Sequence, residues 1–203
     1  PSYFYLRRSD PARPLWYKNE PQYRRGEMSP RPEAQAHPEI AVLEQTPIII
    51  EKILIAATRE QMHWKPAPER WSIGEVLAHM VEVEKLFRDR GRKITEQKDP
   101  LIEPYDQNVA YAAGNYSHKD AVDTLREFCH ERDQSVTWLR YLPESARART
   151  GRHAEIGSFT LGQMMNQWAF HDLGHIRQIS ELYRARAFWP RIGAAQRFYT
   201  IHP

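Results

Sequence analysis

Apolar residues recur at steps of three and four along most of the chain, and this spacing places them on one face of an α-helix. No stretch alternates convincingly between apolar and polar residues, so we expect no β-strand. Four amphipathic helices joined by loops predict an all-α fold, a four-helix bundle whose helices cross at roughly 20°. The predicted helices span residues 38–62, 72 to between 94 and 100, 117–141 and 160–186.

Several predicted helices begin with recognisable N-terminal signals. In a capping box, a Ser or Thr caps the helix and a Glu or Gln three residues later bonds back to the cap. The first predicted helix is different, because Pro47 removes one backbone donor and should either kink the helix or divide it. The predicted capping pairs are Ser72 with Glu75, Thr160 with Gln163 and, with Asp in the place of Glu, Ser117 with Asp120.

Residues 1–37 differ from the rest of the chain. They hold six of the fifteen prolines and show no sustained period, which predicts an irregular N-terminal arm rich in basic and aromatic residues. The arm carries seven Lys or Arg residues against four acids and so accounts for the whole net charge of +3. Residues 38–203 are electrically balanced, and we therefore expect this four-helix-bundle domain to bind no nucleic acid.

The sequence carries no signal for a membrane or for export. It has no run of eighteen apolar residues and no long apolar segment in the N-terminal arm. Its single cysteine, Cys129, allows no intrachain disulfide. We therefore expect a cytoplasmic protein with no membrane partner.

Three histidines occupy the apolar faces of two predicted helices. His171 and His175 are four residues apart, so both side chains lie on the same face of the last predicted helix. His79 lies within the apolar stripe of the helix that begins near Ser72. Three neutral imidazoles suit a divalent metal such as zinc, nickel, iron or cobalt and leave a further position for water or substrate. The competing interpretation is that these histidines are hydrogen-bonded core residues.

Five polar residues share the helix faces of these histidines and are candidates to orient the imidazole rings. A carboxylate or an amide at the far ring nitrogen would fix the tautomer that a metal requires. Other roles stay open, because Glu75 is already assigned to a cap, and Glu82, Asp172 and Gln178 can be solvated. The candidates are Glu75, Glu82, Gln167, Asp172 and Gln178.

Two other metal motifs fit the sequence less well. Residues 171–175, HDLGH, differ from the zinc-protease pattern HExxH by a shorter acid, and the third inward histidine lies upstream rather than downstream. A di-iron site would need inward glutamates with Glu-x-x-His spacing on two helices, and we find no such set in the sequence.

Three segments together resemble the DinB-like, YfiT-type superfamily of metal-dependent proteins. They are residues 65–79 (KPAPERWSIGEVLAH), residues 159–161 (FTL) and residues 171–179 (HDLGHIRQI). The resemblance covers roughly residues 38–188, and it implies a four-helix bundle that holds a divalent metal, often nickel or zinc. It also implies that the three metal ligands are His79, His171 and His175.

The resemblance further implies a reaction class. Characterised members of the superfamily are similar to thiol-dependent transferases and isomerases that use bacillithiol, mycothiol or glutathione. We therefore expect a metal-dependent S-transferase or isomerase that acts on a small molecule with a low-molecular-weight thiol, and a homodimer is one assembly to test. A metal would activate such a thiol by lowering its pKa.

Two alternative functions stay open. One is a non-catalytic interaction module in which the metal stabilises the bundle. The other is a hydrolase that activates water at the metal. The sequence identifies no catalytic residue beyond the metal ligands, and it does not select the metal, the thiol or the electrophile.

Overall fold

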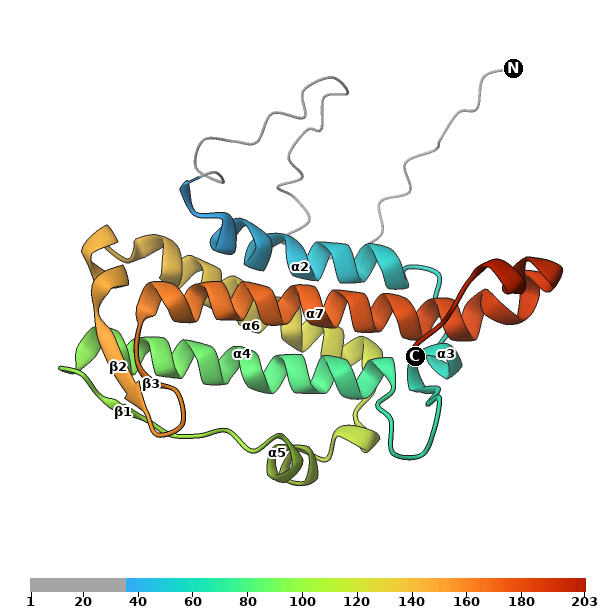
Figure 1. Cartoon of the computed structure of the whole chain (residues 1–203), viewed down its shortest axis with the longest axis horizontal. Coiled ribbons are helices and arrows are strands. Elements are labelled where there is room, and N and C mark those ends of the chain that lie inside the picture. The colour runs from blue at the N-terminus through green and yellow to red at the C-terminus, as the bar shows by residue number, and fades with distance from the viewer. Residues whose placement is uncertain (1–35) are drawn as a thin grey trace, which may run out of the picture. The chain divides into compact units, whose positions relative to one another are not determined.

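The structure is a computed structural model that describes residues 36–203. Its main elements are four long helices (Figure 1). They are α2 (Pro38–Leu54), α4 (Ile73–Glu96), α6 (Ala121–Tyr141) and α7 (Leu161–Ala187). Helices α2 and α7 run in one direction and α4 and α6 in the other (Figure 1). Both α2 and α4 pack against α6 and α7, so α2 and α4 lie diagonally across the bundle. This arrangement confirms the predicted all-α four-helix bundle.

The predicted N-terminal arm, residues 1–37, lies outside the described residues except for its last two positions. Helix α2 begins at Pro38, where the sequence predicts the start of the helical domain. In residues 36–203, no helix is both long enough and apolar enough to cross a membrane.

Two apolar clusters fill the bundle, and a layer of buried polar side chains lies between them. Each cluster takes residues from all four long helices. On three helices a buried polar residue comes between members of the two clusters: Thr46 on α2, Arg132 on α6 and Asp172 on α7. The largest members of the clusters are Phe87 and Trp168 in the first, and Phe128 in the second.

A small three-stranded sheet contradicts the expectation that the chain has no strand. Its strands are β1 (Leu101–Ile102), β2 (Thr150–His153) and β3 (Gly157–Thr160). Strands β2 and β3 form an antiparallel hairpin, and β1 pairs with β2 in parallel. Gly157 has a φ of 76°, a backbone conformation that favours glycine, and it begins the returning strand. The strands are too short for alternation of apolar and polar residues to reveal them.

The first predicted helix is interrupted after Leu54 rather than at Pro47. Helix α2 continues through Pro47, and a separate short helix, α3 (Arg59–His63), follows. A proline inside a helix leaves the carbonyl four residues earlier without its backbone donor, here the carbonyl of Leu43. Nη1 of Arg132 donates a hydrogen bond to this oxygen at 2.7 Å. The neighbouring helix α6 therefore satisfies the carbonyl that Pro47 frees.

Short helices and turns connect the long helices and form the C-terminal tail. The short elements are α5 (Gln107–Gly114), η2 (Tyr116–His118), η3 (Glu144–Ala148), η4 (Trp189–Arg191) and η5 (Gly193–Phe198). The segment from Asp99 to Tyr116, which connects α4 to η2, contains one short helix, α5. The tail, residues 187–203, packs back on α7, where Nη2 of Arg184 donates to the carbonyl of Thr200 at 2.5 Å.

Two of the three predicted capping boxes are present. The Glu75 amide donates to Ser72 Oγ at 3.2 Å, and the Ser72 amide donates to Glu75 Oε2 at 2.7 Å. Thr160 and Gln163 make the same reciprocal pair at 3.1 and 2.8 Å. These caps start α4 and α7, the two helices that carry the predicted metal ligands.

The third predicted capping box is wrong, because α6 begins after Asp120 and not after Ser117. The Asp120 carboxylate accepts hydrogen bonds from the amides of Val122 and Asp123 at 3.0 and 3.1 Å. Ser117 lies instead in η2. A carboxylate also faces the positive end of the helix dipole, so Asp120 is the stronger cap.

The replacement of Asp120 by alanine tests this assignment. We expect Asp120→Ala to lower the free energy of unfolding by about 1 kcal/mol, because two amides at the start of α6 lose their acceptor. The matched variant Ser117→Ala should change stability by less than about 0.5 kcal/mol. Urea unfolding of both variants measures the difference, and a larger loss for Ser117→Ala would contradict the structure.

Candidate metal centre

The three predicted ligands converge on one point inside the bundle. His79 comes from α4, and His171 and His175 come from consecutive turns of α7. Nε2 of His171 lies 3.2 Å from Nε2 of His79 and 3.1 Å from Nε2 of His175. Nitrogen atoms that share a tetrahedral zinc ion at about 2.0–2.1 Å are separated by roughly 3.3 Å. The spacing of the three nitrogens therefore fits a shared divalent metal.

Burial keeps the three imidazoles neutral. The pKa of His79 and the pKa of His171 are both lowered to about 3. Burial is the main cause, and the neighbouring imidazoles act in the same direction. Burial also lowers the pKa of His175. A metal binds the lone pair of a neutral imidazole, so these side chains hold the form that ligation requires.

Gln178 contacts the far nitrogen of His175. Its Oε1 lies 2.9 Å from Nδ1 of His175, and a carbonyl oxygen can only accept a hydrogen bond. The proton therefore sits on Nδ1, and the lone pair of Nε2 faces the other two histidines. Of the five candidates for orienting a ring, Gln178 is the one that the described structure places against a histidine.

A tyrosine, and not the predicted Glu82, lies against the far nitrogen of His79. Oη of Tyr105 lies 3.5 Å from Nδ1 of His79. Tyr105 is hydrogen-bonded to Tyr116, and Tyr116 donates in turn to Glu82. Glu82 is therefore separated from His79 by two hydroxyl groups, because the segment between α4 and α6 inserts its tyrosines between them.

The other three candidates do not contact an imidazole. Glu75 is occupied by its cap and by Tyr111 Oη at 2.6 Å. Asp172 is turned toward Arg132 and is buried. Gln167 is exposed and lies on the wall of a cavity beside the histidines. The two carboxylates have stronger partners, since a cation or several donors stabilise a carboxylate more than a neutral imidazole does.

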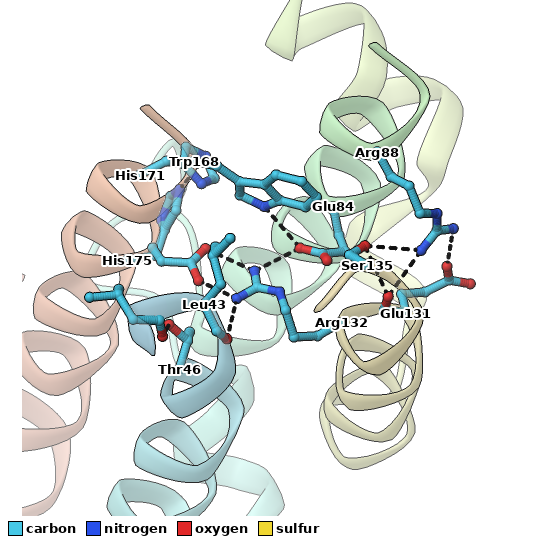
Figure 2. Close-up of polar contacts among 12 residues, drawn as sticks. Leu43, Thr46, Glu84, Arg88, Glu131, Arg132, Ser135, Trp168, His171 and His175 are labelled. Carbon is cyan, nitrogen blue, oxygen red and sulfur yellow. Dashed lines mark hydrogen bonds and ion pairs between the residues drawn. The ribbon is translucent and has the colours of Figure 1, made fainter. Parts of the chain in front are cut away.

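A buried arginine lies at the centre of the polar layer beside the histidines (Figure 2). The Arg132 side chain, 2% exposed, donates from Nη1 to Asp172 Oδ2 at 2.5 Å and from Nη2 to Glu84 Oε2 at 2.6 Å. Trp168 Nε1 donates to the same Glu84 oxygen at 3.0 Å. The full burial of Arg132 is a finding of the structure.

This network carries more negative than positive charge. Two carboxylates face one guanidinium, and Glu84 Oε1 is buried without a hydrogen-bond partner in the described residues. A buried negative charge is costly unless a cation lies nearby. Asp172 is next to His171 in the chain, so a divalent cation held by the histidines would offset this charge. The network therefore supports the fit of a metal to the site.

Arginine 132 should be essential for stability. We expect Arg132→Met to lower the free energy of unfolding by about 3–5 kcal/mol, because it leaves two buried carboxylates without their cation. The matched control is Arg126→Met, an exposed arginine of the same helix that pairs only with Asp123, which should cost less than about 0.5 kcal/mol. Chemical unfolding compares the two, and equal stability would mean that the ion pairs do not hold the core.

A cavity of about 810 Å³ opens beside the histidines. His171 and His175 form part of its wall, and the remaining wall comes from other residues of α7, from α4, from the segment before α4 and from the C-terminal tail. Its volume is in the range that holds a small molecule. The other lining residues are Arg70, Phe87, Gln167, Phe170, Gly174, Arg177, Gln178, Glu181, Arg184, Thr200 and His202.

Sequence reasoning missed several residues of this cavity. The returning tail brings the exposed His202, together with Thr200, to the cavity wall. The backbone amide of His202 donates to Glu181 Oε1 at 2.6 Å and anchors the tail on α7. No spacing in the sequence could reveal this, because the contact depends on how the tail folds back.

Comparisons with known proteins agree with the fold. The sequence model of the DinB superfamily matches residues 43–179, and the chain belongs to this superfamily. A putative metal-dependent hydrolase of Oceanobacillus iheyensis is 24% identical over 145 residues, which cover 71% of this chain and 83% of that protein. Among solved structures, YfiT from Bacillus subtilis superposes with a TM-score of 0.68 at 22% identity, over 79% of this chain and 94% of that one. YfiT is described as a probable metal-dependent hydrolase with an unusual four-helix bundle topology.

Loss of one histidine should abolish metal binding. We expect the untagged wild-type chain to hold about one divalent ion and His79→Ala or His175→Ala to hold none, because two imidazoles leave the site short of the three protein ligands of an open site. Inductively coupled plasma mass spectrometry measures the bound metal.

The control for this experiment is His130→Ala, which removes an exposed histidine of α6 and should leave the metal content unchanged. If both site variants are folded and still hold metal, the three histidines are not the ligands. If the wild-type chain takes up no metal, the three histidines are hydrogen-bonded core residues and not metal ligands.

Proposed function

We propose that the chain is a metal-dependent hydrolase that acts on a small molecule. One observation carries the proposal: three neutral imidazoles converge on one point, and two of them form the wall of a cavity large enough for a substrate. A site with three protein ligands and an accessible side is typical of a catalytic metal rather than a structural one. The names of the Oceanobacillus and Bacillus relatives support hydrolysis as the reaction class.

Four residues would form and orient the metal site. His79, His171 and His175 hold the metal, and Gln178 fixes the ring of His175 so that its lone pair points to the metal. A divalent ion at this site lowers the pKa of water and polarises a substrate carbonyl or phosphoryl group. His202 lies in the cavity wall and has no side-chain partner in the described structure, so its imidazole is available to hydrogen-bond a bound molecule.

The choice of metal follows from the ligands. Three nitrogen donors and no carboxylate favour zinc or nickel, and they also accept iron or cobalt. We propose zinc or nickel as the resident ion. The partner of the site would be a small-molecule substrate.

Two other functions predicted from the sequence stay predictions. Thiol-dependent S-transfer needs a thiol cofactor, and no described residue favours a thiol over water as the nucleophile. A metal-stabilised interaction module needs no cavity beside the metal. The cavity therefore favours an enzyme over an interaction module. The homodimer expected from the sequence also stays a prediction.

A substrate panel tests the proposal. The untagged chain, loaded with zinc or nickel or stripped with a chelator, is mixed with p-nitrophenyl acetate, p-nitrophenyl phosphate and a p-nitroanilide. We expect release of the chromophore only in the loaded protein, independent of added thiol, because the metal activates water. His171→Ala should fall to the rate of the stripped protein, and His130→Ala should equal the wild type.

Two outcomes would overturn the proposal. Consumption of 1-chloro-2,4-dinitrobenzene only when glutathione or bacillithiol is added, with no hydrolysis in the panel, would identify the transferase instead. A large drop in melting temperature on metal removal, with no turnover of any substrate, would identify the interaction module.

A further inference from the structure

The cavity beside the histidines carries arginines that have no partner in the described protein. Arg70 comes from the segment before α4, and Arg177 comes from α7, two residues after His175. Both are exposed, and neither guanidinium makes a hydrogen bond or an ion pair within residues 36–203. The third arginine of the wall, Arg184, is paired with Glu181, with Nε 2.6 Å from Oε2.

The charges of this wall do not balance. The imidazoles are neutral, and the pair of Arg184 with Glu181 cancels, so Arg70 and Arg177 leave two positive charges in the cavity. A divalent ion on the histidines would add to this positive field. A concave surface of one charge concentrates ligands of the opposite charge.

The wall also has an apolar part. The ring of Phe87 lies 6.0 Å from that of His171, centroid to centroid, and Phe170 is 81% exposed on the same helix as the ligands. Both line the cavity. A molecule that fills this space would therefore contact aromatic rings in one region and guanidinium groups in another.

We propose that the substrate of this site is a small molecule with an apolar or aromatic body and an anionic group, a carboxylate or a phosphate, which Arg70 and Arg177 bind. A guanidinium group matches the oxygens of both anions with two parallel hydrogen bonds. The inference rests on the proposed function, since it names the substrate class of the same cavity. The arginines bind and orient the anionic group, and they take no part in bond cleavage.

Binding measurements on the full chain test this inference without relying on turnover. Isothermal titration calorimetry compares phenyl phosphate and phenylacetate with the uncharged phenylacetamide, in the zinc-loaded and in the metal-free protein. We expect at least one anion to bind about tenfold or more tightly than the amide in both forms, since a hydrogen bond to a charged group is worth that factor. The stronger of the two anions identifies the group as phosphate or carboxylate.

Arginine variants locate the binding site. Arg70→Gln and Arg177→Gln should each weaken the anion by roughly tenfold and leave the amide unchanged, and the double variant should abolish the preference for an anion. The matched control is Arg92→Gln, an exposed arginine of α4 that does not line the cavity and whose side chain also lacks a partner in residues 36–203. It should bind like the wild type.

The inference and the proposed function can fail separately. If phenylacetamide binds as tightly as both anions, or if the two cavity variants bind like the wild type, the inference is wrong even where the loaded protein hydrolyses esters. If the anions bind through Arg70 and Arg177 but nothing is hydrolysed, the inference stands and the hydrolase is wrong.

Discussion

The interaction on which the rest of the structure depends is the set of hydrogen bonds made by one buried guanidinium. Arg132 of α6 contacts Glu84 of α4, Asp172 of α7 and the Leu43 carbonyl of α2, so all four long helices meet at this side chain (Figure 2). Each contact has a strict geometric requirement, because a charge in the core must keep its partners. Apolar packing alone tolerates small slips of one helix past another, and this network does not. The hydrogen bonds of Arg132 therefore fix the positions of the four helices along the bundle axis.

That register is also what brings the metal ligands together. Asp172 is adjacent to His171, and Glu84 lies five residues after His79, so the residues that bind Arg132 and those that converge on the metal share α4 and α7. Asp172 also acts electrostatically on His175 and would favour a cation held by the histidines. The buried ion pairs that hold the helices and the candidate metal centre therefore lie next to each other in the bundle. The proline of α2 belongs to the same arrangement, because it frees the carbonyl that Arg132 binds.

Sequence reasoning found the helices and the three histidines, since both follow from local periodicity. Steps of three and four predict an apolar face whatever the rest of the chain does, and His79, His171 and His175 lie on such faces. The same reasoning placed Gln178 beside His175 correctly but failed for other residues around the histidines. It assigned Asp172 and Glu82 to imidazoles, whereas Asp172 binds Arg132 and Glu82 binds Tyr116. It also placed the start of α6 at Ser117. Ser117 and Asp120 are both good N-cap residues, and the sequence pattern alone does not show which of the two caps the helix.

The sequence by itself determined the class of the fold, the starts of α4 and α7 and the helix faces on which the three histidines lie, because caps and helix faces depend on residues within a few positions of one another. The tertiary structure alone decided which polar side chains face each other across the bundle and which line the cavity. Tyr105, Arg70 and His202 come from separate parts of the chain, and each reaches the site through a loop or a tail whose path no local pattern encodes. The short strands β1–β3 are a further case, since strands of two to four residues are recognisable only once they are paired.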